Sequence, residues 1–161
     1  MPEWSSRGAR LSSAVASGCV LSHPPPTGFV VNSKRRAGQG EENAVVDDCL
    51  FCRIVRKEVG SDIIDEKPTA IAFRDVNPQA PVHVLIVPKE HIPTVADLLA
   101  IPNSCEVLSD IFALISDIVV SEGIAQSGYR IVANVGEEAG QAIDHLHFHL
   151  LGGRFMGWPP G

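Results

Sequence analysis

Apolar and polar residues alternate strictly along residues 145–150, where a histidine occupies every second position. Successive side chains of a β-strand point to opposite faces, so His145, His147 and His149 would share one face at intervals of about 6.6 Å. The leucine and phenylalanine side chains between them would enter a core. The pattern therefore predicts a strand with one buried apolar face and one face that carries three imidazoles.

Other short apolar runs predict strands at 63–66, 70–74, 83–87 and 129–134. Helical spacing of apolar residues predicts a short helix over 49–57. Apolar steps of three and four residues between 92 and 122 predict a long helix, with Pro102 and Asn103 separating an earlier turn from it and Gly123 ending it. Strands on both sides of one long helix indicate an α+β domain built on an antiparallel sheet.

The first 45 residues differ from the rest in composition. Residues 4–39 contain no acidic residue, seven serines and five Lys or Arg residues. Such a segment buries too little apolar surface to offset its chain entropy, which indicates a disordered extension over 1–45 and a folded domain over 46–161. A plain tail and an organelle transit peptide both fit this composition. The second interpretation predicts a mitochondrion or plastid, and the first predicts the cytoplasm.

Charge and length limit the class of protein. The net charge of −6 and the isoelectric point of about 5.4 favour neither a nucleic acid nor an anionic membrane as partner. No apolar run approaches the roughly 18 residues of a membrane-spanning helix. Four cysteines are too few for a disulfide scaffold at this length, so a reducing compartment is the default expectation.

The three imidazoles leave several kinds of chemistry open. A solvated strand face usually carries Lys, Glu or Thr, so a plain polar face is the weakest interpretation. Three histidines on a strand could bind a metal ion such as zinc. They could also supply a nucleophile with its electrostatic partners, because a neutral imidazole attacks phosphorus well. Cys49 and Cys52 form a Cys-x-x-Cys pair, which alone fits zinc binding, a redox pair or chance.

Together these residues resemble the histidine-triad nucleotide-binding family. The likeness covers roughly 47–161 and rests on the His-x-His-x-His-apolar-apolar motif together with other matches in order: Cys49-Leu50-Phe51-Cys52, Ala72-Phe73-Arg74-Asp75-Val76, Pro78-Gln79-Ala80-Pro81-Val82-His83, Val87-Pro88-Lys89, Asn134, Gly140-Gln141, Gly152-Gly153-Arg154 and Trp158-Pro159-Pro160-Gly161. The Trp-Pro-Pro-Gly ending resembles the Hint branch, the purine nucleoside phosphoramidases, more than the dinucleotide hydrolases.

The resemblance implies a role for each matching residue. His147 would attack the α-phosphate of an adenosine or guanosine 5′-phosphoramidate and form a nucleotidyl-histidine, which water hydrolyses to the monophosphate. His149 would donate to the phosphate, His83 would orient His147 through the carbonyl near His145, and His145 would complete the triad. The implied nucleotide-binding residues are Phe51, Ile54, Phe73, Asp75, Val76, Asn134, Gly140, Gln141, Ala142 and Ile143. Core packing is the alternative for the apolar walls around the purine, and a turn cap is the alternative for Asp75.

The resemblance implies no cofactor for the chemistry, but it does imply a structural zinc site. Some family members bind zinc through residues that match Cys49, Cys52, His91 and His145. Two half-buried thiols are the alternative interpretation. The family also implies a homodimer, in which Trp158 would reach towards the partner's active site.

Two positions depart from the family pattern. Ala142 stands where a Ser or Thr hydroxyl is usual near the scissile bond, and Asp144 stands where an aromatic residue commonly precedes the triad. Two rival functions therefore stay open. One is a nucleotide-binding scaffold with weak activity, which Ala142 favours slightly. The other is a dinucleotide polyphosphate hydrolase or nucleotidyl transferase, against which the Trp-Pro-Pro-Gly ending speaks.

Overall fold

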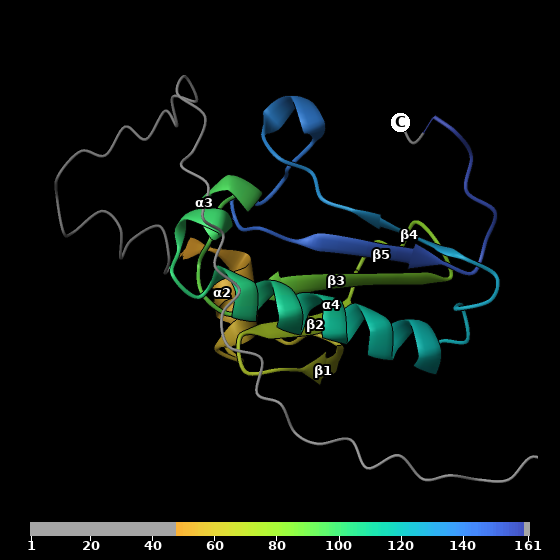
Figure 1. Cartoon of the computed structure of the whole chain (residues 1–161), viewed down its shortest axis with the longest axis horizontal. Coiled ribbons are helices and arrows are strands. Elements are labelled where there is room, and N and C mark those ends of the chain that lie inside the picture. The colour runs from red at the N-terminus through yellow and green to blue at the C-terminus, as the bar shows by residue number, and fades with distance from the viewer. Residues whose placement is uncertain (1–47, 160–161) are drawn as a thin grey trace, which may run out of the picture. The chain divides into compact units, whose positions relative to one another are not determined.

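The structure is a computed structural model that describes residues 48–159 (Figure 1). The extension expected over 1–45, its targeting role and the expected domain start at 46 lie outside the described residues. Within 48–159, no helix combines the length and the apolar character needed to cross a membrane.

A five-stranded antiparallel sheet forms the centre of the fold, with the spatial order β1-β2-β3-β5-β4. Its strands are β1 (Ile63–Glu66), β2 (Ala70–Arg74), β3 (Val82–Pro88), β4 (Tyr129–Val132) and β5 (Phe148–Gly152). The α+β prediction is confirmed. The predicted bounds of β1 and β2 match the structure. β3 extends one residue beyond the prediction at both ends, and β4 ends two residues earlier than predicted.

Three α-helices and one short 3₁₀ turn complete the described fold: α2 (Leu50–Val55), α3 (Val95–Ala100), α4 (Ser104–Ser121) and η1 (Glu137–Ala139). The predicted helical region is thus divided at Pro102 and Asn103. Thr94 caps α3 because its Oγ1 accepts a hydrogen bond from the Asp97 N–H at 3.2 Å. After α4, Gly123 adopts a φ of 68°, which ends the helix as predicted.

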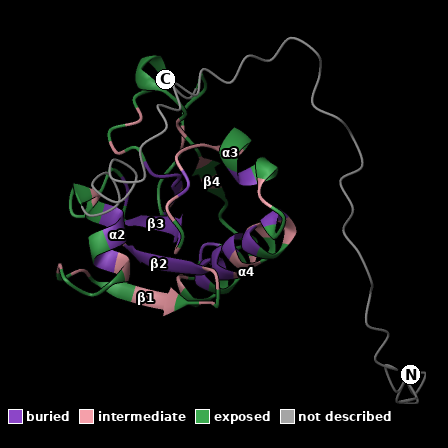
Figure 2. Cartoon of the chain, turned by 90° about the vertical axis from the view of Figure 1, so that its left-hand side faces the viewer, coloured by how far each residue is buried: buried purple, intermediate pink, exposed green. Residues whose placement is uncertain are grey.

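The two faces of the sheet carry different layers. On one face, α4 packs its apolar side onto alternate residues of the strands, including Val84, Ile86 and Leu150, all fully buried. On the other face, the short helix α2 covers a second apolar cluster: Phe51, Ile54, Ile71, Phe73, Leu85 and Val87. Figure 2 shows the buried strands β2 and β3 between these helices. The histidines of β3 and β5 lie on the face of α2, because they alternate with residues that face α4.

The triad strand begins later than predicted. The β3–β5 ladder ends at the pair Ile86 and Phe148, so His145 and His147 lie in the segment that leads into β5. This segment instead bonds elsewhere: the Leu146 N–H donates to the Ile92 carbonyl at 2.6 Å. The alternation survives outside the strand, since Leu146 joins the α4 core and the flanking histidines face away from it.

Candidate active site and metal centre

The histidine face of the sheet meets α2 at Phe51. The Phe51 ring makes edge-to-face contacts with His147, Phe73 and His145, with ring centroids 5.3, 5.6 and 5.8 Å apart. Such contacts fix ring orientations better than plain apolar packing does. Phe51 therefore joins the apolar cluster under α2 to two histidines of the triad.

His147 is oriented by a backbone group. Its Nδ1 lies 2.7 Å from the carbonyl oxygen of His145, and a carbonyl can only accept. Nδ1 must therefore carry the proton and donate, which leaves a lone pair on Nε2. An imidazole held in this tautomer is suited to nucleophilic attack through Nε2. His147 is buried, with 5% of the residue's surface exposed.

A second chain of hydrogen bonds assigns the tautomers of His83 and His149. The Gln79 N–H donates to Nδ1 of His83 at 3.1 Å, so the His83 proton sits on Nε2. That Nε2 lies 2.9 Å from Nδ1 of His149 and donates to it. His149 consequently carries its own proton on Nε2. The expectation was that His83 orients His147 through the carbonyl near His145: the His145 carbonyl does bond to His147, but the side chain of His83 bonds to His149.

Asp75 lies beside this chain. Its Oδ2 is 3.3 Å from Nε2 of His83, and its Oδ1 accepts from the Asn77 N–H at 2.8 Å. The second bond is a turn-capping interaction, which was the alternative interpretation of Asp75. Burial lowers the pKa of His83, and the nearby Asp75 carboxylate partly opposes that shift. Burial also lowers the pKa of His149, helped by the neighbouring His147 and His83.

The Gln141 side chain bonds both to its own loop and to the segment before α3. Its Oε1 accepts from the Gly136 N–H at 2.8 Å, while its Nε2 donates to the carbonyls of Pro93 and Ile143 at 2.9 and 3.2 Å. The backbone N–H groups of Gly140 and Gln141 also donate within the loop, to Glu137 and Gly136. These donors are engaged within the fold, and the expectation that Gly140 and Gln141 hold phosphate oxygens stays a prediction.

The other implied nucleotide-binding residues divide into buried and exposed groups. Phe51, Ile54 and Phe73 are at most 6% exposed, so they are core residues here, as the alternative interpretation had it. Val76 is 99% exposed and forms no packed wall. Asn134 and Ile143 are half-buried, and Ile143 packs against the apolar cluster under α2.

Cys49, Cys52, His91 and His145 come together as the sequence predicts, with one donor atom of each within 4.8 Å of the others. Nδ1 of His145 lies 3.5 Å from Sγ of Cys49 and 3.6 Å from Sγ of Cys52. Nδ1 of His91 lies 3.3 Å from Sγ of Cys52. In a tetrahedral zinc site, ligand sulfur and nitrogen atoms lie about 3.6 Å apart, given Zn–S of about 2.3 Å and Zn–N of about 2.0–2.1 Å. The donor set and its spacing therefore fit zinc.

The tautomer of His145 also suits a ligand. Its Nε2 lies 2.9 Å from the Pro88 carbonyl and must donate to it, so the lone pair of Nδ1 faces the thiols. A backbone acceptor of this kind is the usual outer support of a metal-binding histidine. Burial lowers the pKa of His145 to about 4, which keeps the ring neutral. Burial and the adjacent Cys49 thiol raise the pKa of Cys52 to about 12, so thiolate formation there needs a compensating cation.

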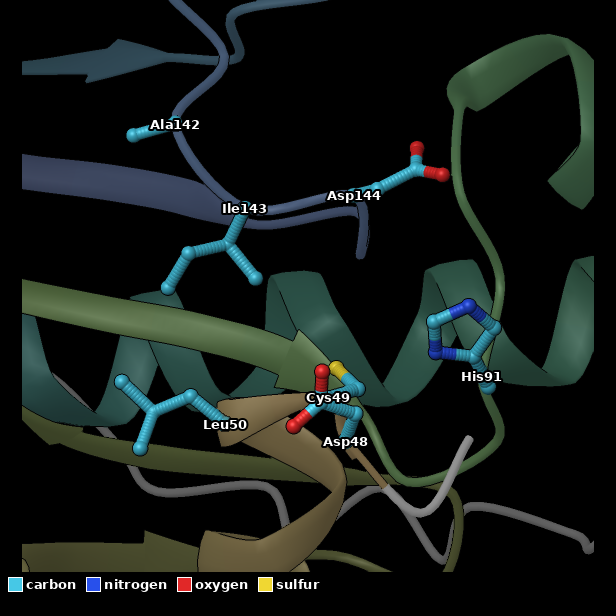
Figure 3. Close-up of a pocket in the computed structure, with 7 residues that line it drawn as sticks. All are labelled: Asp48, Cys49, Leu50, His91, Ala142, Ile143 and Asp144. Atoms are coloured by element: carbon cyan, nitrogen blue, oxygen red, sulfur yellow. The ribbon is translucent and has the colours of Figure 1, made fainter. Parts of the chain in front are cut away.

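An open groove of about 510 Å³ lies beside the Cys–His cluster. Figure 3 shows Ala142, Ile143 and Asp144 on one side of it, and the start of α2 with Asp48, Cys49 and Leu50 on the other. Both positions that depart from the family pattern, Ala142 and Asp144, thus line the same groove. Asp48 and Leu50 were not expected at the site, and no chemical signal in the sequence marks them.

Two backbone groups were also missed, the Gln79 N–H and the Pro88 carbonyl. Each fixes a histidine tautomer, yet a backbone donor or acceptor has no residue type to reveal it. The sequence did offer an indirect signal. The motif Pro78-Gln79-Ala80-Pro81 precedes His83 in the chain, and the motif Val87-Pro88-Lys89 precedes His91.

Comparison with known proteins gives one consistent result. The family model "HIT domain" matches residues 56–156. The purine nucleoside phosphoramidase of Escherichia coli K12 is 41% identical over 113 residues, covering 70% of this chain and 93% of that protein. An uncharacterised HIT-like protein of Synechococcus elongatus is 43% identical over 115 residues, covering 71% and 98%. The crystal structure of a HIT family hydrolase from Legionella pneumophila aligns with a TM-score of 0.67 and 44% identity, covering 71% of this chain and all of that one.

Proposed function

The chain belongs to the HIT domain family, and we propose that it is a hydrolase that cleaves the P–N bond of purine nucleoside 5′-phosphoramidates. The observation that carries the proposal is the 2.7 Å hydrogen bond from Nδ1 of His147 to the His145 carbonyl, which leaves Nε2 free to attack. The similarity to the phosphoramidase of E. coli supports the substrate class.

The reaction has two steps. Nε2 of His147 forms a bond to the α-phosphorus as the P–N bond breaks, and the departing nitrogen must take up a proton to leave as a neutral amine. That proton comes from solvent, while His149 carries its own proton on Nε2, where it can donate a hydrogen bond to a phosphate oxygen, and the 2.9 Å bond from His83 holds the His149 ring in this tautomer. Water then attacks phosphorus and loses a proton to solvent, the bond from phosphorus to Nε2 of His147 breaks, and neutral His147 and the nucleoside monophosphate result.

The test is replacement of the proposed nucleophile. His147→Ala should lower turnover of an adenosine phosphoramidate by ~10³-fold or more, as loss of a covalent nucleophile typically does. Mass spectrometry of acid-quenched wild-type protein should find one added nucleotidyl group, and His147→Ala should show none. Circular dichroism checks that the variant is folded. Retention of more than about a tenth of the wild-type rate would contradict the assignment of His147.

The same assay separates the rival functions. Offering a diadenosine polyphosphate and a sugar nucleotide beside the phosphoramidate tests the dinucleotide hydrolase and the nucleotidyl transferase. A nucleotide-binding scaffold, which Ala142 favours because it lacks a hydroxyl, would bind adenosine monophosphate but turn over none of the three substrates.

We also propose that Cys49, Cys52, His91 and His145 hold a structural zinc ion. The fit of their donor atoms to a tetrahedral site supports this. The ion would stabilise the thiolates and tie α2 to the sheet, and it takes no part in bond cleavage. Elemental analysis of protein purified without chelator should find about one zinc per chain, and absence of metal would count against the site.

A homodimer is the third proposal. β4 is an edge strand with exposed Tyr129 and Ile131, and exposed Phe112 and Val120 on α4 add apolar surface. Trp158 is 86% exposed, which is consistent with a role beyond its own subunit. Light scattering at micromolar concentration should give the mass of two chains, whereas the mass of one chain would contradict the proposal.

Residues 1–45 are proposed to direct the protein to a mitochondrion or plastid, on the evidence of their composition alone. A fluorescent reporter fused to this segment should enter the organelle. A reporter that stays in the cytosol would favour the plain tail and cytoplasmic localisation.

A further inference from the structure

His145 takes part in two sets of contacts. Its ring lies between the two thiols through Nδ1 and the Pro88 carbonyl through Nε2. Its backbone carbonyl accepts the hydrogen bond that orients His147. The side chain of His145 is therefore part of the Cys–His cluster, and its backbone carbonyl orients the proposed nucleophile.

The segment around His145 has few other anchors. Residues 143–147 lie outside the β5 ladder, so no strand neighbour holds their backbone. The bonds from Leu146 to Ile92 and from the His145 N–H to the Ile143 carbonyl hold it locally. The planar peptide group that carries the His145 carbonyl is therefore held by the Leu146–Ile92 bond on one side, and the anchoring of the His145 ring adds the second constraint on the direction of the carbonyl.

Phe51 makes a second link between the cluster and His147. It lies between Cys49 and Cys52, and its ring packs against both His145 and His147. Helix α2 has six residues, and a helix that short is not stable on its own in water. Its position against the sheet, and that of Phe51, therefore rests on apolar packing together with the contacts of the two cysteines.

We infer that the Cys49, Cys52, His91 and His145 cluster is the positioning device for His147, so that a divalent ion bound there controls the rate of the reaction. This rests on the proposed function. With an ion bound, the His145 ring and α2 are held by bonds to one centre. Without it, the ring keeps the Pro88 bond and its contacts with the two sulfur atoms, and both the carbonyl and the Phe51 ring lose one support. His145, Cys49, Cys52 and His91 are positioning residues in this account, since none of them need contact substrate.

The test compares the full chain loaded with zinc and the same chain stripped by a chelator. Long-range ¹H–¹⁵N NMR reports which nitrogen of the His147 ring carries the proton. The loaded protein should show a single Nδ1–H form, and the stripped protein a mixture of forms. The kcat on an adenosine phosphoramidate should fall about tenfold or more, the equivalent of one lost orienting hydrogen bond, with KM changed by less than about threefold. An unchanged His147 signal and an unchanged kcat in the stripped protein would overturn the inference.

Variants separate positioning from general loss of stability. Cys49→Ala should lose the thiolate–cobalt absorption band on titration with Co²⁺, lose the single His147 form and lose rate. Cys49→His, which restores a fourth ligand at a half-buried position open to the groove, should recover the single His147 form and the rate, with a thiolate–cobalt band from Cys52 alone. Val107→Ala is the matched control, because Val107 is buried in the α4 core, away from both sites. An equal loss of kcat in Val107→Ala at the same folded fraction would contradict the inference.

The proposed function and this inference fail differently. If the zinc-loaded chain hydrolyses no phosphoramidate, the proposed function fails. The NMR comparison then still decides whether the cluster positions His147.

Discussion

Gln141 offers a sharp test of how the loop beside the triad is held. Its side chain makes three hydrogen bonds: one from the Gly136 N–H and two to the carbonyls of Pro93 and Ile143. A hydrogen bond contributes about 0.5–1.5 kcal/mol net, and the half-buried position places the total near the lower end, so Gln141→Ala should weaken the loop by about 2 kcal/mol.

Amide hydrogen exchange at Gly136 measures this directly, because its N–H donates to Oε1 of Gln141. A loss of about 2 kcal/mol corresponds to about 30-fold faster exchange at that amide. Turnover should fall as well, since Ala142 and Ile143 follow Gln141 in the chain. Unchanged exchange at Gly136 together with unchanged turnover would refute the reasoning.

Gln141→Glu is the matched variant, because it keeps the acceptor for Gly136 but turns an anionic oxygen towards two carbonyls. At neutral pH it should be worse than Gln141→Ala. The folded-state pKa of the new carboxyl would lie above its unfolded value of about 4.3. The penalty is therefore fully present above the folded pKa and is relieved as the pH falls towards the unfolded pKa. A Glu variant more stable than the Ala variant at neutral pH would show that Nε2 contributes nothing.

Three further outcomes are expected. Lys57 has a φ of 61° after α2, so Lys57→Gly should stabilise the fold by about 0.5–1 kcal/mol in urea unfolding, and no gain would contradict backbone strain there. Burial lowers the pKa values of His83 and His149 below the ordinary histidine pKa of 6.5. Below pH 6.5 the unfolded state therefore binds more protons than the folded state, and the free energy of unfolding should decrease as the pH falls through 6.5. His83→Gln should reduce that dependence, while an equal slope in both proteins would count against it. Ala142→Ser should restore a hydroxyl near the departing nitrogen, so turnover should rise more for phosphoramidates whose leaving amine is strongly basic than for those whose leaving amine is weakly basic. Equal effects on both substrates would exclude a role of residue 142 in leaving-group departure.

The local pattern of the sequence was enough to predict most of the fold. Short apolar runs identified β1 and β2 with their bounds, and apolar steps of three and four residues identified α4. The start of β5 was wrong because alternation reports burial, not ladder partners. Residues 145–147 alternate as a strand would, yet their backbone bonds to Ile92 rather than to β3.

The candidate site was predictable where a motif carries the chemistry and not where backbone groups do. The four Cys and His residues of the cluster were named in advance and do come together. The hydrogen bonding of Gln141 was not, because its partner Pro93 lies 48 positions away and is a carbonyl. The pairing of His83 with His149 across 66 positions could likewise not be read from either residue alone.

Four imidazoles on one sheet face acquire different roles through their backbone partners. The Gln79 N–H fixes His83, the Pro88 carbonyl fixes His145, and the His145 carbonyl fixes His147. Backbone groups do not titrate, so each tautomer holds as long as its ring is neutral, and burial favours the neutral form of His83, His145 and His149 by lowering their pKa values. A substitution that leaves every histidine in place but moves one of these backbone groups should therefore impair the site as well, by about the tenfold that one lost orienting hydrogen bond corresponds to. The segment before β5 is not paired with a neighbouring strand, yet it is important for the proposed reaction because its His145 carbonyl orients His147.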